Sequence, residues 1–192
     1  MWSFFLYLRI PMEAGNFLIA SPTIIGDYNF QRSGVILVDH KSTGSIGFIV
    51  NKPLEYTLDE LVENVNRSFP LYYGGPVEQD NLFFIHQLGA LIADSIQINE
   101  NLFWSGDFDQ VMELVNAGRI SFDQIRFFLG YSGWGEGQLE AELKEEAWIL
   151  KDTIDPEEWM RTSNEEFWKN QMVALGGKYL IWSNAPENPM SN

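Results

Sequence analysis

Short apolar runs of strand length, each closed by glycine, proline or a polar turn, dominate the first two thirds of this chain. The clearest are 34–39 (GVILVD), 46–51 (IGFIVN), 82–87 (LFFIHQ) and 125–130 (IRFFLG). Runs of roughly four to eight apolar residues between turn residues are typical of buried strands. These strands outnumber the helical stretches and do not alternate regularly with them. The sequence therefore predicts an α/β (α+β mixed) fold, with helices around a mixed or barrel-like sheet.

The remaining elements are predicted from local turn and capping signals. The runs at 34–39 and 46–51 form a hairpin through Gly44. Shorter strands are expected at 17–20, 71–73, 95–98, 102–104 and 179–182. A capping box at 57–60 (TLDE) begins a short helix, and Gly118 ends a helix that starts after Asp107. Further helices are expected after 137, at 155–156 and after a second capping box at 163–166 (SNEE).

A chain of 192 residues is long enough to form one self-supporting domain. We expect that domain to span 15–182, flanked by an N-terminal extension at 1–14 and a polar C-terminal tail at 183–192. The apolar run in MWSFFLYLRI is short for a signal sequence and has no cationic stretch before it. The sequence favours Met12 as the natural start, which N-terminal sequencing of the native protein would test.

The charge balance argues against two classes of partner. Lys and Arg number 12, Asp and Glu number 27, and the net charge is −15 with no cluster of basic residues. Affinity for nucleic acid depends on cations that neutralise phosphates, so direct nucleic-acid binding is not expected. The same negative field disfavours anionic membranes. The absence of cysteine excludes disulfides and thiolate chemistry, and it is compatible with the cytoplasmic location that we expect.

No motif in the chain predicts a catalytic, cofactor or metal site. A P-loop, a complete GxGxxG, HExxH and an EF-hand loop are all absent from the sequence. His40 and His86 each end an apolar strand, where a structural role is the simpler interpretation. Ser132 in GYSG resembles a nucleophile elbow, but the second glycine follows it too soon, and a tight turn explains the segment better. Trp134, beside it, could be buried or could face a partner.

Several segments match a known family in order and spacing over more than a hundred residues. They are ASP at 20–22, FQRS at 30–33 leading into VILVDH, NKPL at 51–54, GGPV at 74–77, LGYSGW at 129–134 and GQLE at 137–140. Together they resemble the YqgE/AlgH family of bacterial proteins. The resemblance implies a split, partly barrel-like β-sheet surrounded by helices, in a family often described as transcriptional regulators. It implies no catalytic residue and no cofactor. Ser132 stands where the family usually has alanine, and Gly34 replaces an apolar residue, which indicates a bulge.

Three functional hypotheses remain open at this point. The first is a regulatory or interaction protein that acts through protein or small-molecule contacts rather than on DNA. The alternative is a small-ligand-binding protein or enzyme, with a pocket where polar groups converge at strand ends. The residues proposed for that pocket are Ser21, Arg32, Asn51, Gly75, His86, Tyr131 and Gln138. The third is a scaffold whose acidic C-terminal half docks a basic partner.

Overall fold

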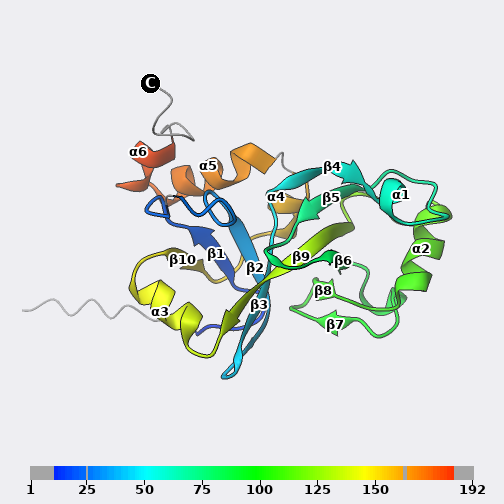
Figure 1. Cartoon of the computed structure of the whole chain (residues 1–192), viewed down its shortest axis with the longest axis horizontal. Coiled ribbons are helices and arrows are strands. Elements are labelled where there is room, and N and C mark those ends of the chain that lie inside the picture. The colour runs from blue at the N-terminus through cyan, green and yellow to red at the C-terminus, as the bar shows by residue number, and fades with distance from the viewer. Residues whose placement is uncertain (1–10, 25, 162–163, 184–192) are drawn as a thin grey trace, which may run out of the picture.

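A computed structural model describes residues 11–24, 26–161 and 164–183 of the chain. Its ten strands belong to one sheet with the order β10-β1-β2-β3-β9-β6-β8-β7, and β4 and β5 lie off this path (Figure 1). The strands are β1 (Phe17–Ala20), β2 (Gly34–Lys41), β3 (Gly44–Ile49), β4 (Pro53–Thr57), β5 (Pro70–Tyr73), β6 (Val77–His86), β7 (Ile96–Gln97), β8 (Phe103–Trp104), β9 (Ile125–Gly135) and β10 (Trp148–Lys151).

Six α-helices and one 3₁₀ turn lie around the sheet in the described part of the chain (Figure 1). They are α1 (Leu58–Leu61), η1 (Gly89–Leu91), α2 (Phe108–Asn116), α3 (Gln138–Lys144), α4 (Pro156–Met160), α5 (Asn164–Leu175) and α6 (Tyr179–Ser183). The capping box at Thr57 and Glu60 and the Asp107 cap of α2 are both present, as the sequence predicts. Among the described residues, no helix is both long and apolar enough to cross a membrane.

Strand β9 is shared by two halves of the sheet. Its first half pairs with β5 in parallel and with β6 antiparallel, whereas its second half pairs with β3. We call β10, β1, β2, β3 and the second half of β9 the first half-sheet. The second half-sheet consists of β4, β5, β6, β7, β8 and the first half of β9. The mixed α/β class and the split sheet are therefore confirmed. The sheet stays open, because β10 and β7 lie at opposite ends of the strand order and do not close it into a barrel.

The helices cover both faces of the first half-sheet. Phe17 and Ile19 of β1 belong to a core that includes Trp168 of α5, while Leu18 and Ala20 pack with Leu139 of α3 on the opposite face. Alternate side chains of a strand point to opposite faces, so a strand buried on both sides is apolar throughout. Helix α2 packs on the second half-sheet, where Val111 and Val115 join a separate apolar cluster.

Glycines allow the β5–β6 link to pass close to β9. A Cβ atom at Gly75 would overlap the backbone of Tyr131 and Ser132, and one at Gly74 would overlap the carbonyl oxygen of Gly130. Gly75 also has φ +151°, a conformation that other residues rarely adopt. Gly34 makes a different close approach, because its Cβ would meet the ring of Phe167. The bulge expected at Gly34 is absent there, and the irregularity of β2 lies between Leu37 and Asp39.

Three other expectations differ from the structure. Residues 179–182 form helix α6 rather than a strand, because the periodicity of so short an apolar run does not distinguish the two. The tight turn expected around Ser132 is continuous strand, and β9 runs straight through to Gly135. Strands β4 and β10 were not predicted, since each is short and lacks strong alternation. The segments 1–10 and 184–192 and the second capping box lie outside the described residues or side chains.

Candidate functional site

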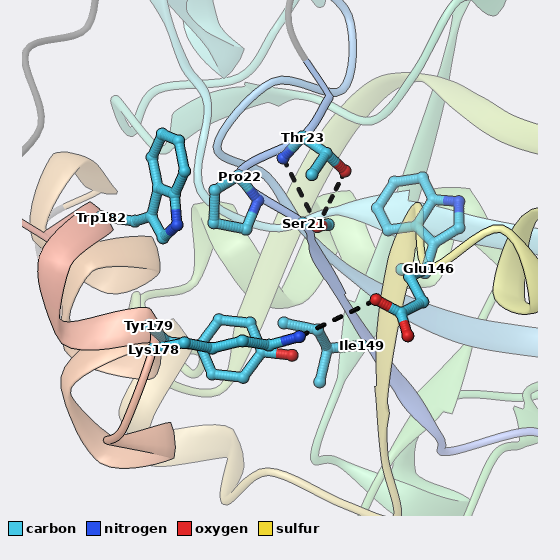
Figure 2. A pocket seen from close by; sticks show the side chains of 9 residues that line it. Ser21, Pro22, Thr23, Glu146, Ile149, Lys178, Tyr179 and Trp182 are labelled. Carbon is cyan, nitrogen blue, oxygen red and sulfur yellow. Dashed lines mark hydrogen bonds and ion pairs between the residues drawn. The ribbon is translucent and has the colours of Figure 1, made fainter.

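A pocket of about 310 Å³ lies where the end of β1 and the start of β10 face α6 (Figure 2). Three parts of the chain line it: the turn after β1, the start of β10 with the residue two positions before it, and α6 with the residue just before it. The lining residues are Ser21, Pro22, Thr23, Glu146, Trp148, Ile149, Lys178, Tyr179 and Trp182. The pocket therefore combines aromatic rings, two aliphatic hydroxyl groups, the phenol of Tyr179 and one pair of opposite charges.

The turn after β1 places both hydroxyl groups. The backbone N–H of Ser21 donates to the carbonyl oxygen of Ala147 at 2.9 Å. This hydrogen bond ends the backbone pairing beside β1, because Pro22 has no N–H to continue it. The hydroxyls of Ser21 and Thr23 lie 3.0 Å apart and share one hydrogen bond. Two hydroxyl groups carry two protons, so this pair keeps donor and acceptor capacity for a further polar group.

Trp148 forms a wall that is fixed from behind by a carboxylate. Its indole Nε1 donates to Oε2 of Glu142 at 2.7 Å, and Nε1 of Trp134 donates to the same oxygen at 2.9 Å. Gln138 donates to the other carboxylate oxygen at 2.9 Å. Phe30 packs edge-on against Trp148 with ring centroids 5.4 Å apart. Trp134 and Trp148 are both buried, so this aromatic cluster is a rigid support for the pocket.

Helix α6 closes the opposite side. Gly176 and Gly177, with φ +67° and +51°, turn the chain between α5 and α6, and a Cβ atom at either would meet open space. Tyr179 packs against the core, and Lys178 reaches across the pocket toward Glu146 with Nζ 3.8 Å from Oε2 (Figure 2). Both charged side chains are largely exposed, at 68% and 83%. Two glycines in left-handed conformations therefore position one whole wall of the pocket.

The structure brings only some of the predicted site residues to this pocket. Ser21 lines it, and Gln138 supports it through Glu142. Arg32 and Asn51 lie together beside the start of β2, where Nδ2 of Asn51 donates to the carbonyl oxygen of Arg32 at 2.9 Å. The guanidinium of Arg32 lies 5.2 Å from the ring of Trp168. Neither residue is part of the pocket lining.

Gly75 and Tyr131 form a separate contact beneath the β5–β6 link. The backbone of Gly75 passes against that of Tyr131, whose ring packs on Phe83 at 5.7 Å between centroids. Ser132, next along β9, donates its hydroxyl hydrogen to the carbonyl oxygen of Gly74 at 3.0 Å and is fully buried. Its side chain thus fastens the link to β9.

His86 is buried in the second half-sheet and is fully engaged. The N–H of Leu88 donates to Nδ1 at 3.2 Å, which assigns the proton to Nε2. Nε2 lies 3.2 Å from the carbonyl of Ser105 and 3.1 Å from Oγ of Ser95. Burial lowers the pKa of His86, and the bond to Ser105 partly opposes this effect. Because Ser95 donates to Ile92, His86 is not arranged as its base.

Sequence reasoning did not single out Arg126, the one arginine described as buried. It lies within the apolar run of β9 and donates to the carbonyl oxygens of Val50 at 2.6 Å and Met160 at 3.0 Å. Its guanidinium lies 3.9 Å from the centre of the Tyr72 ring. Burial lowers the pKa of Arg126 to about 10, while the interaction with Tyr72 raises it. The sequence feature that could have identified Arg126 is a charged residue within an otherwise apolar strand.

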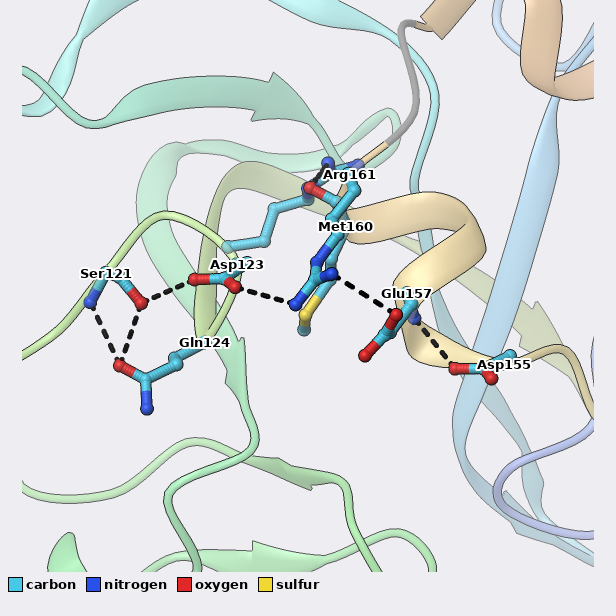
Figure 3. A network of polar contacts seen from close by, with 8 residues as sticks. Ser121, Asp123, Gln124, Asp155, Glu157, Met160 and Arg161 are labelled. Atoms are coloured by element: carbon cyan, nitrogen blue, oxygen red, sulfur yellow. Dashed lines mark hydrogen bonds and ion pairs between the residues drawn. The ribbon is translucent and has the colours of Figure 1, made fainter.

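In contrast to the buried Arg126, Arg161 at the end of α4 belongs to an exposed cluster of charges (Figure 3). It pairs with Asp123 at 3.0 Å and with Glu157 at 3.3 Å, which ties the turn before β9 to α4. A hydrogen bond from Ser121 is the main cause of the lowered pKa of Asp123. Among the described residues, no group of three acidic or histidine side chains is arranged to hold a metal ion. These ion pairs therefore have a structural role, which is to connect the turn before β9 with α4 at the surface.

The fold and the hollow at the edge of its sheet define a class: mixed α/β proteins with a split, open sheet and an aromatic-lined pocket. A family model described as AlgH-like (DUF179) matches residues 17–180. The chain belongs to this AlgH-like family, as its sequence segments predict.

Relatives and solved structures agree with this assignment. A UPF0301 protein of Cytophaga hutchinsonii is 41% identical over 183 residues, covering 94% of this chain and 100% of the relative. A UPF0301 protein of Chlorobium limicola is 40% identical over 184 residues, covering 94% and 96%. The solution structure of AlgH from Pseudomonas aeruginosa has a TM-score of 0.71 and 29% identity, covering 92% and 96%. A crystal structure from Corynebacterium diphtheriae, at 18% identity, shares the fold with a TM-score of 0.72, covering 91% and 93%.

Proposed function

We propose that this chain is a binding protein without chemistry of its own, which takes a small molecule in the pocket between Ser21 and Trp182. The observation that carries the proposal is the construction of that pocket. One wall, Trp148, is fixed by Glu142, and the other, α6, is presented by two glycines. A pocket of about 310 Å³ with aromatic walls and a few polar groups has the size and composition of small-molecule sites.

The hydrogen bonds made by the two histidines and by Ser132 support a binding role over an enzymatic one. His86 and Ser132 are committed to hydrogen bonds that hold the fold together. His40 lies 2.8 Å from the hydroxyl of Ser45, on the β2–β3 hairpin, and does not line the pocket. A nucleophile needs a base within hydrogen-bond reach, and none of these pairs lies beside the aromatic walls.

We infer that the protein acts in the cytoplasm. We further infer that its regulatory role works through this ligand and through protein contacts, and not through DNA binding. The net charge of −15 supports this part of the proposal. A gel-shift assay with genomic fragments at physiological salt tests it, and we expect no saturable binding. A complex that forms tightly at that salt concentration would contradict the charge reasoning.

A thermal-shift screen with a metabolite panel tests the pocket. We expect at least one compound to raise the melting temperature, since a ligand at about 100 times its Kd stabilises by roughly 2.7 kcal/mol. Thr23→Trp fills the pocket from its exposed rim and should abolish the shift. Thr43→Trp, in the exposed turn of the β2–β3 hairpin, is the matched control and should retain it. The proposal fails if no compound acts, or if both variants respond equally.

A second candidate function is a protein contact through the outer surface of α5 and α6. Val173 of α5 and Leu180 and Ile181 of α6 are 48%, 46% and 77% exposed, and exposed apolar side chains that adjoin one another favour association. A photo-cross-linking residue at position 181 should give one discrete adduct in cells. The same residue at position 43, in the exposed turn of the β2–β3 hairpin, is the control. Equal adducts at both positions would refute a specific contact.

A further inference from the structure

We propose that the pocket recognises a small zwitterion with one flat ring system, in the class of the aromatic α-amino acids. This inference rests on the proposed function and specifies its ligand. Its ammonium group would replace Lys178 as the partner of Glu146, and its carboxylate would replace Glu146 as the partner of Lys178. The ring would lie between Trp148 on the sheet side and the aromatic side chains of α6.

The charged pair at the mouth favours a ligand that carries both charges. Lys178 and Glu146 lie 3.8 Å apart and are largely exposed, and such pairs contribute only about 0–1 kcal/mol. A zwitterion can separate them at little cost and pair with each. A ligand with one charge would attract one partner and face the like charge of the other. The pair therefore discriminates between zwitterions and singly charged compounds.

The walls favour a flat ring. Trp148 is 4% exposed and held by its hydrogen bond to Glu142, and Tyr179 and Trp182 line the pocket from α6 (Figure 2). Pro22 and Ile149 complete the apolar lining. Aromatic pairs contribute about 0.5–1.5 kcal/mol beyond the burial of their area. A volume of about 310 Å³ is at the small end of the range for ligand sites, which matches one ring system with a short side chain.

The backbone at Glu146 gives independent support. Helix α3 ends in a Schellman motif, in which Ala147 N–H donates to Glu142 O and Glu146 N–H donates to Leu143 O. Glu146 holds the left-handed position with φ +57°, where glycine is usual. A side chain in this conformation costs roughly 1–2 kcal/mol.

Helix α2 shows the usual solution in the same molecule. Its Schellman motif has Arg119 N–H donating to Leu114 O and Gly118 N–H donating to Val115 O, with Gly118 at φ +68°. The two motifs have the same hydrogen bonds and differ in the residue at the left-handed position. At α3 the left-handed position thus carries a glutamate that lines the pocket, in place of the glycine found at α2.

Isothermal titration calorimetry with matched indole compounds tests the ligand class. L-Tryptophan, L-tyrosine and L-phenylalanine are titrated first, and we expect at least one to bind. For L-tryptophan, the analogues are tryptamine, which lacks the carboxylate, and indole-3-propionate, which lacks the amine. We expect each analogue to bind about tenfold more weakly, which corresponds to about 1.4 kcal/mol per lost charge contact. Analogues that bind as tightly as L-tryptophan would overturn the proposal.

Two exposed substitutions assign the contacts. Lys178→Met should abolish the preference for L-tryptophan over tryptamine but keep the preference over indole-3-propionate. Glu146→Gln should do the reverse. Lys169→Met and Glu145→Gln change neighbouring exposed charges and should leave both preferences intact. Equal effects of the test and control variants would show that the overall electrostatic field of the protein, and not direct contacts with Lys178 and Glu146, sets the preference. That result would refute the proposed contacts.

The outcomes separate this inference from the proposed function. If no aromatic amino acid binds but the metabolite panel yields a compound whose effect Thr23→Trp abolishes, the ligand class is wrong and the pocket stands. If neither experiment gives a ligand, both proposals fail. If L-tryptophan binds equally to the wild type and to Thr23→Trp, it binds elsewhere, and the inference about this pocket is refuted.

Discussion

The two half-sheets share β9, yet their polar side chains have opposite surroundings. In the second half-sheet, His86 is buried and bonded through both ring nitrogens. At the edge of the first half-sheet, Ser21, Glu146 and Lys178 surround an open hollow. The comparison sets a structural use of polar groups, at His86, beside the edge of the first half-sheet, where we propose that another molecule binds. Substitutions should therefore affect stability in one and binding in the other.

The largest effect is expected where the β5–β6 link crosses β9. Gly75→Ala places a methyl group against the backbone of Tyr131 and forces an unfavourable φ, so we expect a loss of about 3–5 kcal/mol in the free energy of unfolding. Urea denaturation measures it. Gly137→Ala is the control, because φ is also positive there but a Cβ meets open space, and about 1 kcal/mol is expected. Similar losses in both variants would show that the crossing is not tightly packed.

The next effect concerns the buried guanidinium of β9. Arg126→Met keeps much of the side-chain length but removes the donors to Val50 O and Met160 O, leaving two buried carbonyl groups unpaired. We expect a loss of about 2–4 kcal/mol in urea denaturation. Arg161→Met removes exposed contacts to Asp123 and Glu157 and should cost less than about 1 kcal/mol. A larger loss for Arg161→Met than for Arg126→Met would reverse the proposed contrast.

A pH dependence should arise from the second half-sheet. The pKa of His86 is lowered in the folded state, so below the unfolded value of about 6.5 the unfolded chain binds more protons. The contribution of His86 is complete above that pH. It falls as pH decreases, by up to about 1.4 kcal/mol per unit until the folded pKa is reached.

Denaturation midpoints between pH 5 and pH 7.5 measure this dependence. His86→Gln should flatten the slope. An unchanged slope in His86→Gln would mean that other groups cause the loss of stability.

The smallest effect sharpens the comparison at the two helix ends. Glu146→Gly should stabilise the protein by roughly 1 kcal/mol, because glycine adopts the left-handed conformation without the cost that a side chain bears. Gly118→Ala, at the equivalent position of α2, should destabilise it by a similar amount. The same Glu146→Gly variant should bind the zwitterion less well, so stability and binding should change in opposite directions. A Glu146→Gly variant that is less stable than the wild type would contradict the strain assignment.

Sequence reasoning located most of the fold because local signals agreed with tertiary structure. The hairpin of β2 and β3 and the capped start of α2 follow from apolar runs and single capping residues. It missed β10 and misassigned α6, since runs of four or five residues take their conformation from what they pack against. Of the residues predicted for a pocket at strand ends, Ser21 lines the candidate pocket and Gln138 contacts it only through Glu142. Lys178, Tyr179 and Trp182 were not predicted, because their role depends on the Gly176–Gly177 turn.

The shared strand β9 also sets the order in which the protein can be assembled during synthesis. Residues 125–135 join the two half-sheets, so β3 and β6 have emerged from the ribosome long before their common neighbour is translated. Until then, the unpaired edges of both strands are available to other nascent chains. Pairing across such long stretches of sequence is also slow to form. Newly made copies should thus depend on chaperones more than a chain of this length built from local hairpins.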